Sequence, residues 1–203
     1  MARTALILGT DNQDGAYLAR LLLARGYQVH GVADNAAALS RLGVDGEVEQ
    51  HSRADANVVD AVGADEVYDL RGPGWSRLAD TRQLLGTLRG RPVRLFSAGP
   101  GADDDAVRLI DDARNDGLFA VTGRLFPHES RLGGGNSSVT RIIDAAFRGY
   151  MPAAEDLATD VDCGWAPEYV DAMWRMLQQP RPLDFTLATG RLLGGAETAG
   201  HAF

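Results

Sequence analysis

The sequence predicts an α/β fold, a Rossmann-like doubly wound parallel sheet followed by a reduced C-terminal substrate-binding portion. Short apolar runs alternate with stretches of helical periodicity, and a glycine turn separates the first run from the first helix. The 203 residues, 45% of them hydrophobic, are enough for one domain with a sizeable core. We expect a Rossmann-like part at 1–125, a substrate-binding part at 126–190 and a tail at 191–203.

The first elements form a βαβ unit. Residues 5–8 are an apolar strand, Gly9 follows at once, and apolar residues at 16–23 recur at helical spacing. Gly26 ends this helix, and residues 27–32 predict a second strand. Strand, glycine turn, helix and strand within about thirty residues are the entry to a doubly wound sheet.

The later elements follow the same alternation. The pattern predicts strands at 66–70, 93–96 and 118–121, and helices at 78–89 and 103–114. Residues 33–64 have no clean period, and we expect little order in the Gly- and Ala-rich stretch 192–203.

Composition limits the partners. A net charge of −8 argues against nucleic acid and anionic membrane surfaces. No apolar run approaches the roughly 20 residues that span a bilayer. The single cysteine, Cys163, cannot form an internal disulfide, so we expect a reducing, cytoplasmic setting and a buried thiol. A small-molecule substrate remains as the expected partner.

The glycine turn is altered where a dinucleotide would bind. The three positions of the fingerprint read Gly9, Asn12 and Gly15, so the middle position has gained a side chain. Asp11 and Asp14 add negative charge at the helix N-terminus, where they compete with a phosphate. This favours a turn that serves geometry alone, and we expect no cofactor.

Several motifs together resemble the GDP-mannose 4,6-dehydratase family of extended short-chain dehydrogenase/reductases. The resemblance covers nearly the whole chain, from Thr4 to about Gly190, although the chain is short for that family. The motifs that carry it are Gln13-Asp14-Gly15-Ala16-Tyr17-Leu18, Gly26-Tyr27-Gln28-Val29-His30-Gly31, Asp65-Glu66-Val67-Tyr68, Gly117-Leu118-Phe119-Ala120-Val121, Phe126-Pro127-His128-Glu129-Ser130, Val139-Thr140-Arg141 and Tyr169-Val170-Asp171-Ala172-Met173-Trp174.

The resemblance implies a catalytic Thr and Glu after the strand at 93–96 and a Tyr-x-x-x-Lys helix beyond it. Here the stretch is Ala98-Gly99-Pro100-Gly101-Ala102, and the chain contains no lysine at all. Arginine cannot replace that lysine because it stays protonated and differs in shape.

The binding positions implied by the resemblance have changed as well. Ala33 and Asp34 stand where arginines would hold an NADP 2′-phosphate, so the NADP site is expected to be vestigial. Arg71-Gly72-Pro73-Gly74 replaces a wall of small residues beside the nicotinamide. The resemblance implies basic residues that bind the sugar-nucleotide diphosphate, and of these Arg141 is retained. Arg141 and Arg71 are the predicted substrate-binding residues. GDP-mannose is therefore not the expected ligand.

The predicted catalytic residues are His128, Glu129 and Tyr169. A histidine next to a carboxylate can exchange protons near neutral pH, although adjacent residues on an extended segment point to opposite sides. Residues 131–138 form a loop over the predicted pocket, either a lid, an anion cradle or a plain surface loop. No His, Cys and Asp set has the spacing of a zinc site, so no metal is predicted.

Three functions remain open. The first is a repurposed, cofactor-independent enzyme that uses acid/base chemistry for a cyclisation, isomerisation or dehydration, as in specialised metabolism. The second is a non-catalytic pseudoenzyme that binds a partner. The third is an NAD(P)-dependent nucleotide-sugar dehydratase. The resemblance also implies a homodimer, but the shortened helix leaves the oligomeric state open.

Overall fold

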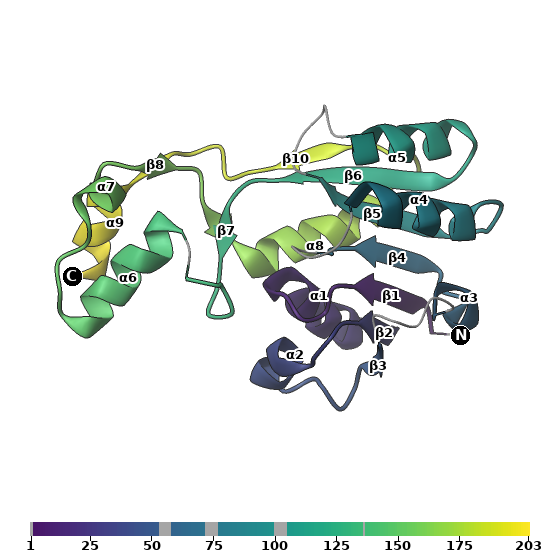
Figure 1. Cartoon of the computed structure of the whole chain (residues 1–203), viewed down its shortest axis with the longest axis horizontal. Helices are drawn as coiled ribbons and strands as arrows, with labels where there is room; N and C mark the ends of the chain where they lie inside the picture. Colours follow the sequence, from purple (N-terminus) through teal and green to yellow (C-terminus); the bar gives the residue numbers. More distant parts are fainter. Residues whose placement is uncertain (1, 53–57, 72–76, 100–104, 136) are drawn as a thin grey trace.

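The computed structural model describes residues 2–52, 58–71, 77–99, 105–135 and 137–203. Its centre is a seven-stranded parallel sheet in the order β10-β6-β5-β4-β1-β2-β3 (Figure 1). The order 3-2-1-4-5-6 is that of dinucleotide-binding folds, here with β10 added beside β6, which confirms the predicted fold class. The strands are β1 (Thr4–Leu8), β2 (Gln28–Val32), β3 (Glu49–His51), β4 (Glu66–Asp69), β5 (Arg94–Gly99), β6 (Phe119–Leu125) and β10 (Phe185–Leu187).

Helices cover both faces of the sheet, as parallel strands buried on both sides require. One face carries α1 (Gln13–Ala24), α2 (Ala37–Leu42) and α8 (Ala166–Leu177), and the other carries α3 (Val58–Val62), α4 (Arg77–Leu88) and α5 (Asp105–Asn115). A hydrophobic core lies on each face of the sheet, and alternate residues of a strand pack into the two cores. Ile7 and Phe96 pack in the first core, whereas Leu6 and Leu95 pack in the second.

A smaller part lies beside the sheet (Figure 1). It contains α6 (Ser138–Arg148), α7 (Ala154–Leu157), β8 (Asp160–Val161), β11 (Leu193–Gly194) and α9 (Gly195–Ala202). The short parallel strands β7 (His128–Glu129) and β9 (Gly164–Trp165) connect it to the sheet. Since α8 and β10 join the main sheet, the chain enters the smaller part twice.

The expectation of little order at residues 192–203 is wrong. These residues form β11 and α9, and α9 packs against α6 and α7. The contact is close because Gly195 has no side chain: a Cβ there would lie 2.0 Å from the carbonyl oxygen of Asp156. A Gly- and Ala-rich helix can therefore pack tightly without large apolar residues.

The other predicted elements are confirmed within a few residues. Residues 33–64, which had no clean period, contain the short elements α2, β3 and α3. In the predicted helix 103–114, Asp103 and Asp104 lie outside the described residues. Asp105 begins α5 at the surface and pairs with Arg108 at 2.8 Å, as expected for a solvated helix start. Among the described residues, no helix is both long and apolar enough to cross a bilayer.

Candidate functional site

A cavity of about 510 Å³ lies where the chain leaves β1 and enters α1. Three segments line it: the turn at Asp11–Gln13, the helix α2 through Ala37, Ala38 and Arg41, and the chain between His128 and Ser137. In open parallel sheets ligands bind outside the carboxyl ends of the strands. The cavity therefore lies where ligands commonly bind in folds of this class.

The two glycines of the turn are required by its geometry. Gly9 has a φ of +104°, and a Cβ there would lie 2.7 Å from the carbonyl oxygen of Leu70. A Cβ on Gly15 would lie 2.1 Å from the carbonyl oxygen of Gly9. These close approaches bring α1 against β1 and β4, which is the role of the first and third fingerprint glycines.

Asn12 is the N-cap of α1. Its Oδ1 accepts a hydrogen bond from the Gly15 backbone N–H at 2.9 Å, and its Nδ2 donates to the Leu70 carbonyl at 2.7 Å. The side-chain amide is thus bound to the turn itself. The cap leaves the backbone N–H groups of Gln13 and Asp14, which α1 cannot pair internally, at the positive end of the helix.

His128 is held by two acceptors. Its Nε2 lies 2.8 Å from Asp14 Oδ1, and its Nδ1 lies 2.7 Å from the Phe126 carbonyl oxygen. Both ring nitrogens must donate to satisfy these contacts, which requires the imidazolium form. Burial lowers the pKa of His128, but the contacts with Asp14 and Phe126 and the charge of Glu129 outweigh it, so the pKa is raised.

The His128–Asp14 pair and two further hydrogen bonds connect β7 and the residue after it to α1. Gln13 Nε2 donates to the His128 carbonyl at 3.1 Å, and Ser130 Oγ donates to Gln13 Oε1 at 2.6 Å. The negative charge of Asp14, which was expected to compete with a phosphate for the helix N-terminus, is offset by the imidazolium. Sequence reasoning missed the His128–Asp14 pair because 114 positions separate the two residues.

Glu129 follows His128 on β7 and lines the same cavity, and no hydrogen bond joins the two side chains in the described part of the chain. A Cβ on Gly133 would lie 2.5 Å from Glu129 Oε2, so the glycine makes room for the carboxylate. Glu129 lines both the cavity at the turn and a neighbouring cavity of about 660 Å³ against α6. It is the predicted catalytic residue that reaches both spaces.

Tyr169 supports His128 from α8. The two rings stack with their centroids 4.3 Å apart, and Tyr169 is 5% exposed. Burial, together with the charges of Asp162, Cys163 and Glu168, raises the pKa of Tyr169 to about 12. Its hydroxyl is buried without a hydrogen-bond partner among the described residues, and Tyr169 is not among the residues that line the cavity at the turn. Tyr169 therefore holds the imidazole in place.

The structure does not bring Arg71 and Arg141 together. Arg71 forms a bidentate ion pair with Asp69, with Nε–Oδ1 and Nη2–Oδ2 distances of 2.6 Å. The Arg71 side chain is 8% exposed. Arg141 Nε lies 3.0 Å from both carboxylate oxygens of Asp156, at the neighbouring cavity. A carboxylate already offsets the charge of each predicted substrate-binding arginine.

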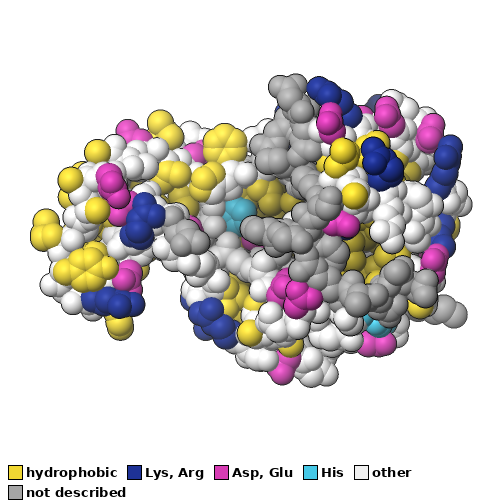
Figure 2. Space-filling model, in the orientation of Figure 1, with side chains coloured by type: hydrophobic (Ala, Val, Ile, Leu, Met, Phe, Trp, Pro, Cys, Tyr) yellow, Lys and Arg dark blue, Asp and Glu magenta, His cyan; other side chains and the backbone are white. Residues whose placement is uncertain are grey.

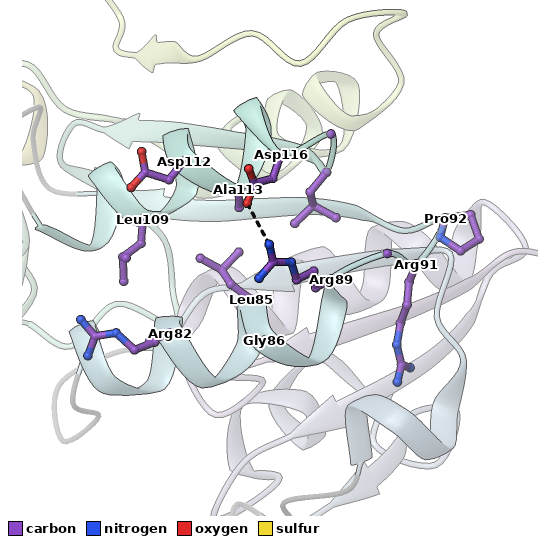
Figure 3. A pocket seen from close by; sticks show the side chains of 13 residues that line it. Arg82, Leu85, Gly86, Arg89, Arg91, Pro92, Leu109, Asp112, Ala113 and Asp116 are labelled. Atoms are coloured by element: carbon purple, nitrogen blue, oxygen red, sulfur yellow. Dashed lines mark ion pairs between the residues drawn. The ribbon is translucent and has the colours of Figure 1, made fainter.

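Other predicted features lie apart from this site. Cys163 is only partly buried, contrary to expectation, and burial raises the pKa of its thiol. Gly72–Gly74, Pro100–Ala102 and Asn136 lie outside the described residues. A third cavity, of about 610 Å³, lies between α4 and α5 beside the Arg89–Asp116 pair (Figure 3). It contains none of the predicted site residues.

A family model and several relatives that resemble this chain carry the same description. A family model described as GDP-mannose 4,6 dehydratase matches residues 106–201. GDP-mannose 4,6 dehydratase of Cricetulus griseus is 27% identical over 94% of this chain and 68% of its own length. The Vibrio cholerae enzyme is 28% identical over the same shares. Both alignments span 259 positions, more than this chain contains, so this chain lacks internal segments of its relatives.

Solved structures share the fold at lower identity. A dTDP-glucose 4,6-dehydratase from Bacillus anthracis, in complex with NAD, has a TM-score of 0.83 at 10% identity, covering 99% of this chain and 80% of its own. A UDP-glucose 4-epimerase from Thermotoga maritima has a TM-score of 0.80 at 13% identity, covering 97% and 80%. The Bordetella bronchiseptica enzyme WbmF, in complex with NADH, has a TM-score of 0.80 at 15% identity, covering 98% and 76%.

The expectation that the chain uses no cofactor is contradicted by two of these structures, the dTDP-glucose 4,6-dehydratase solved with NAD and WbmF solved with NADH. The physical reason lies in the turn. Asn12 seemed to block a phosphate, yet its amide is held by Gly15 and Leu70. The acid at Asp14 is likewise offset by His128. Two of the sequence's arguments against a dinucleotide are thereby removed.

Proposed function

We propose that the chain is a shortened member of the GDP-mannose 4,6-dehydratase family, as its matches to the family model and to relatives 27–28% identical support, and that it is an NAD-binding enzyme acting on a nucleotide-sugar substrate. The cofactor binds in the cavity at the Gly9–Asn12–Gly15 turn, and the sugar lies toward α6. The observation that carries this proposal is the position of Glu129 on the wall of both cavities.

The turn supplies the groups that a pyrophosphate needs. Gly9 and Gly15 allow the tight turn and the close packing of α1, and the N–H groups of Gln13 and Asp14 lie in the first turn of α1, where the helix cannot pair them. Arg41 of α2 lines the same cavity and adds a positive charge. These features support binding of a dinucleotide.

Asp34 favours NAD over NADP. It is exposed and comes two residues after the end of β2, 19 positions after Gly15. An acid about 20 residues beyond the glycine turn accepts hydrogen bonds from the adenosine ribose hydroxyls, whereas a 2′-phosphate would be repelled by it. The chain thus differs from the NADP-binding pattern that the resemblance implied.

Nicotinamide, when bound, supplies a hydride acceptor or donor. The protein must move protons without the Tyr-x-x-x-Lys pair, since the sequence contains no lysine. Glu129 is the carboxylate available for this between the two cavities, as general base or acid in a dehydration or isomerisation. His128, bound to Asp14 and stacked on Tyr169, fixes the strand from which Glu129 projects.

The experiment is a panel of GDP-, UDP- and dTDP-sugars incubated with protein and NAD, with products followed by mass spectrometry. We expect a product lighter by one water, or an isomer separated by chromatography, and its loss in Glu129→Gln. Glu168→Gln, an exposed carboxylate at the start of α8, is the matched control. Equal turnover in Glu129→Gln and the parent protein would refute the role of Glu129.

A second candidate is a non-catalytic binding protein, favoured by the absence of lysine and by the paired state of Arg71 and Arg141. This candidate predicts that NADH binds, as measured by calorimetric titration, while every member of the sugar panel is left unchanged. Absence of NADH binding at millimolar concentration would contradict both candidates.

A further inference from the structure

Two histidines and a glutamate meet at the edge of the sheet, away from the cavity at the turn. His30 lies on β2, and Glu49 and His51 lie on the edge strand β3. The strands are parallel, with His30 opposite Glu49 and Val32 opposite His51. Because alternate strand residues share a face, the register places all three side chains on one side of the sheet.

The ligand atoms of these residues are close together. His30 Nδ1 lies 3.1 Å from His51 Nε2 and 3.5 Å from Glu49 Oε2, and His51 Nε2 lies 3.9 Å from Glu49 Oε1. Two nitrogen or oxygen ligands at about 2.0–2.2 Å from a tetrahedral zinc ion lie about 3.3–3.6 Å apart. The observed separations, measured to Glu49 Oε2 from His30 and to Glu49 Oε1 from His51, bracket that value, and one ligand atom from each residue lies within 4.8 Å of the others. Small side-chain shifts would therefore bring both ring nitrogens and one carboxylate oxygen around one centre.

We propose that His30, Glu49 and His51 form a binding site for a divalent transition metal ion, with Zn²⁺ as the ion that best suits it. Imidazole and carboxylate are both ligands for zinc, and three protein ligands leave one position for water. The histidine side chains are 16% and 18% exposed, whereas Glu49 is 69% exposed. The ion would therefore be reached from solvent on the Glu49 side.

The site has a structural consequence. The strand β3 has three residues and, within the described part of the chain, pairs with β2 alone, so it is held by few hydrogen bonds. An ion bound to His30 of β2 and to both ends of β3 cross-links the two strands. Metal binding should then stabilise this edge of the sheet, independently of the proposed enzymatic function.

The sequence indicated no metal site because the ligands of this group are not closely spaced along the chain. Glu49 and His51 are two positions apart, but His30 is 21 positions away and joins them only through strand pairing. No local spacing rule could find this group.

The test is calorimetric titration of the full chain, without a histidine tag and in a non-chelating buffer, with zinc chloride. We expect one ion per chain with a micromolar dissociation constant. Tetrahedral cobalt(II) absorption bands should appear when cobalt replaces zinc, and added zinc should raise the unfolding temperature. His30→Gln, His51→Gln and Glu49→Gln should each weaken binding at least 10-fold.

The matched control is His201→Gln. His201 and Glu197 form another histidine–carboxylate pair on the exposed helix α9, 3.9 Å apart, and this variant should bind zinc like the parent. Circular dichroism verifies the fold of each variant, and the exposed Glu49 is the safest replacement. No binding at 100 µM zinc, or binding that the three cluster variants leave unchanged, would overturn the proposal.

Discussion

The pair of His128 and Asp14 gives the sharpest stability prediction. In Asp14→Asn the side chain keeps its shape and an acceptor oxygen but loses its charge. Hydrogen bonds between charged groups contribute about 1.5–3 kcal/mol, and breaking a fully buried ion pair costs about 3–5 kcal/mol. With the two side chains 10% and 18% exposed, and an acceptor retained, we expect a loss of about 2 kcal/mol at pH 5.5.

The effect depends on pH with a definite sign. Because the folded protein raises the pKa of His128, the pair stabilises the fold fully below the ordinary histidine pKa of about 6.5. This contribution is lost as the pH rises through the raised value. Asp14→Asn should therefore cost less at pH 9 than at pH 5.5.

The assay is urea unfolding of the parent, Asp14→Asn, His128→Gln and the double variant at both pH values. We expect a coupling free energy of about 1–2 kcal/mol at pH 5.5 and below about 0.5 kcal/mol at pH 9. Asp11→Asn removes the same charge from the same turn without touching His128, and serves as the control. A coupling that is the same at both pH values would refute the assignment of an imidazolium.

Four further predictions concern other parts of the chain. Asp34→Arg should shift the ratio of NADPH to NADH affinity by about tenfold or more toward NADPH in calorimetric titration, because it replaces a repelling charge with an attracting one, while Asp45→Arg should not. Gly15→Ala places a Cβ 2.1 Å from a backbone oxygen and should cost about 3 kcal/mol or more in urea unfolding. Glu66→Gln should cost about 1–3 kcal/mol in the same assay, since this buried carboxylate accepts four side-chain hydrogen bonds. Deletion of residues 192–203 should lower the unfolding temperature by calorimetry, since α9 packs on α6.

The main sheet could be predicted from the sequence because its signals are local. Buried parallel strands are continuous apolar runs, and a glycine turn before a helix is visible in a short window. The short elements between 33 and 64 escaped because a helix of six residues and a strand of three have too few positions to show a period. The helix α9 was not predicted because its packing depends on the close approach of Gly195 to the backbone of Asp156, which composition does not reveal.

The candidate site could be predicted only in part. His128 and Glu129 stand out as neighbours in the sequence, and the structure places both at the cavity. Their roles depend on contacts across the fold. The partner of His128 is Asp14, 114 positions away, and the charge of Arg141 is offset by Asp156. Sequence identifies the residue types, whereas pairing across the fold decides which of them can act.

The absence of lysine from the sequence limits which groups can transfer protons. Arginine stays protonated and binds carboxylates through two parallel hydrogen bonds, so it serves well in the Arg71–Asp69 pair but cannot act as a base. His128 is fixed as a donor to two acceptors, and the pKa of Tyr169 is raised to about 12. Of the three predicted catalytic residues, Glu129 is therefore the proposed proton acceptor. If Glu129→Gln retains full turnover, the proton acceptor must lie outside the predicted set, and if the parent protein has no turnover, the non-catalytic candidate gains support.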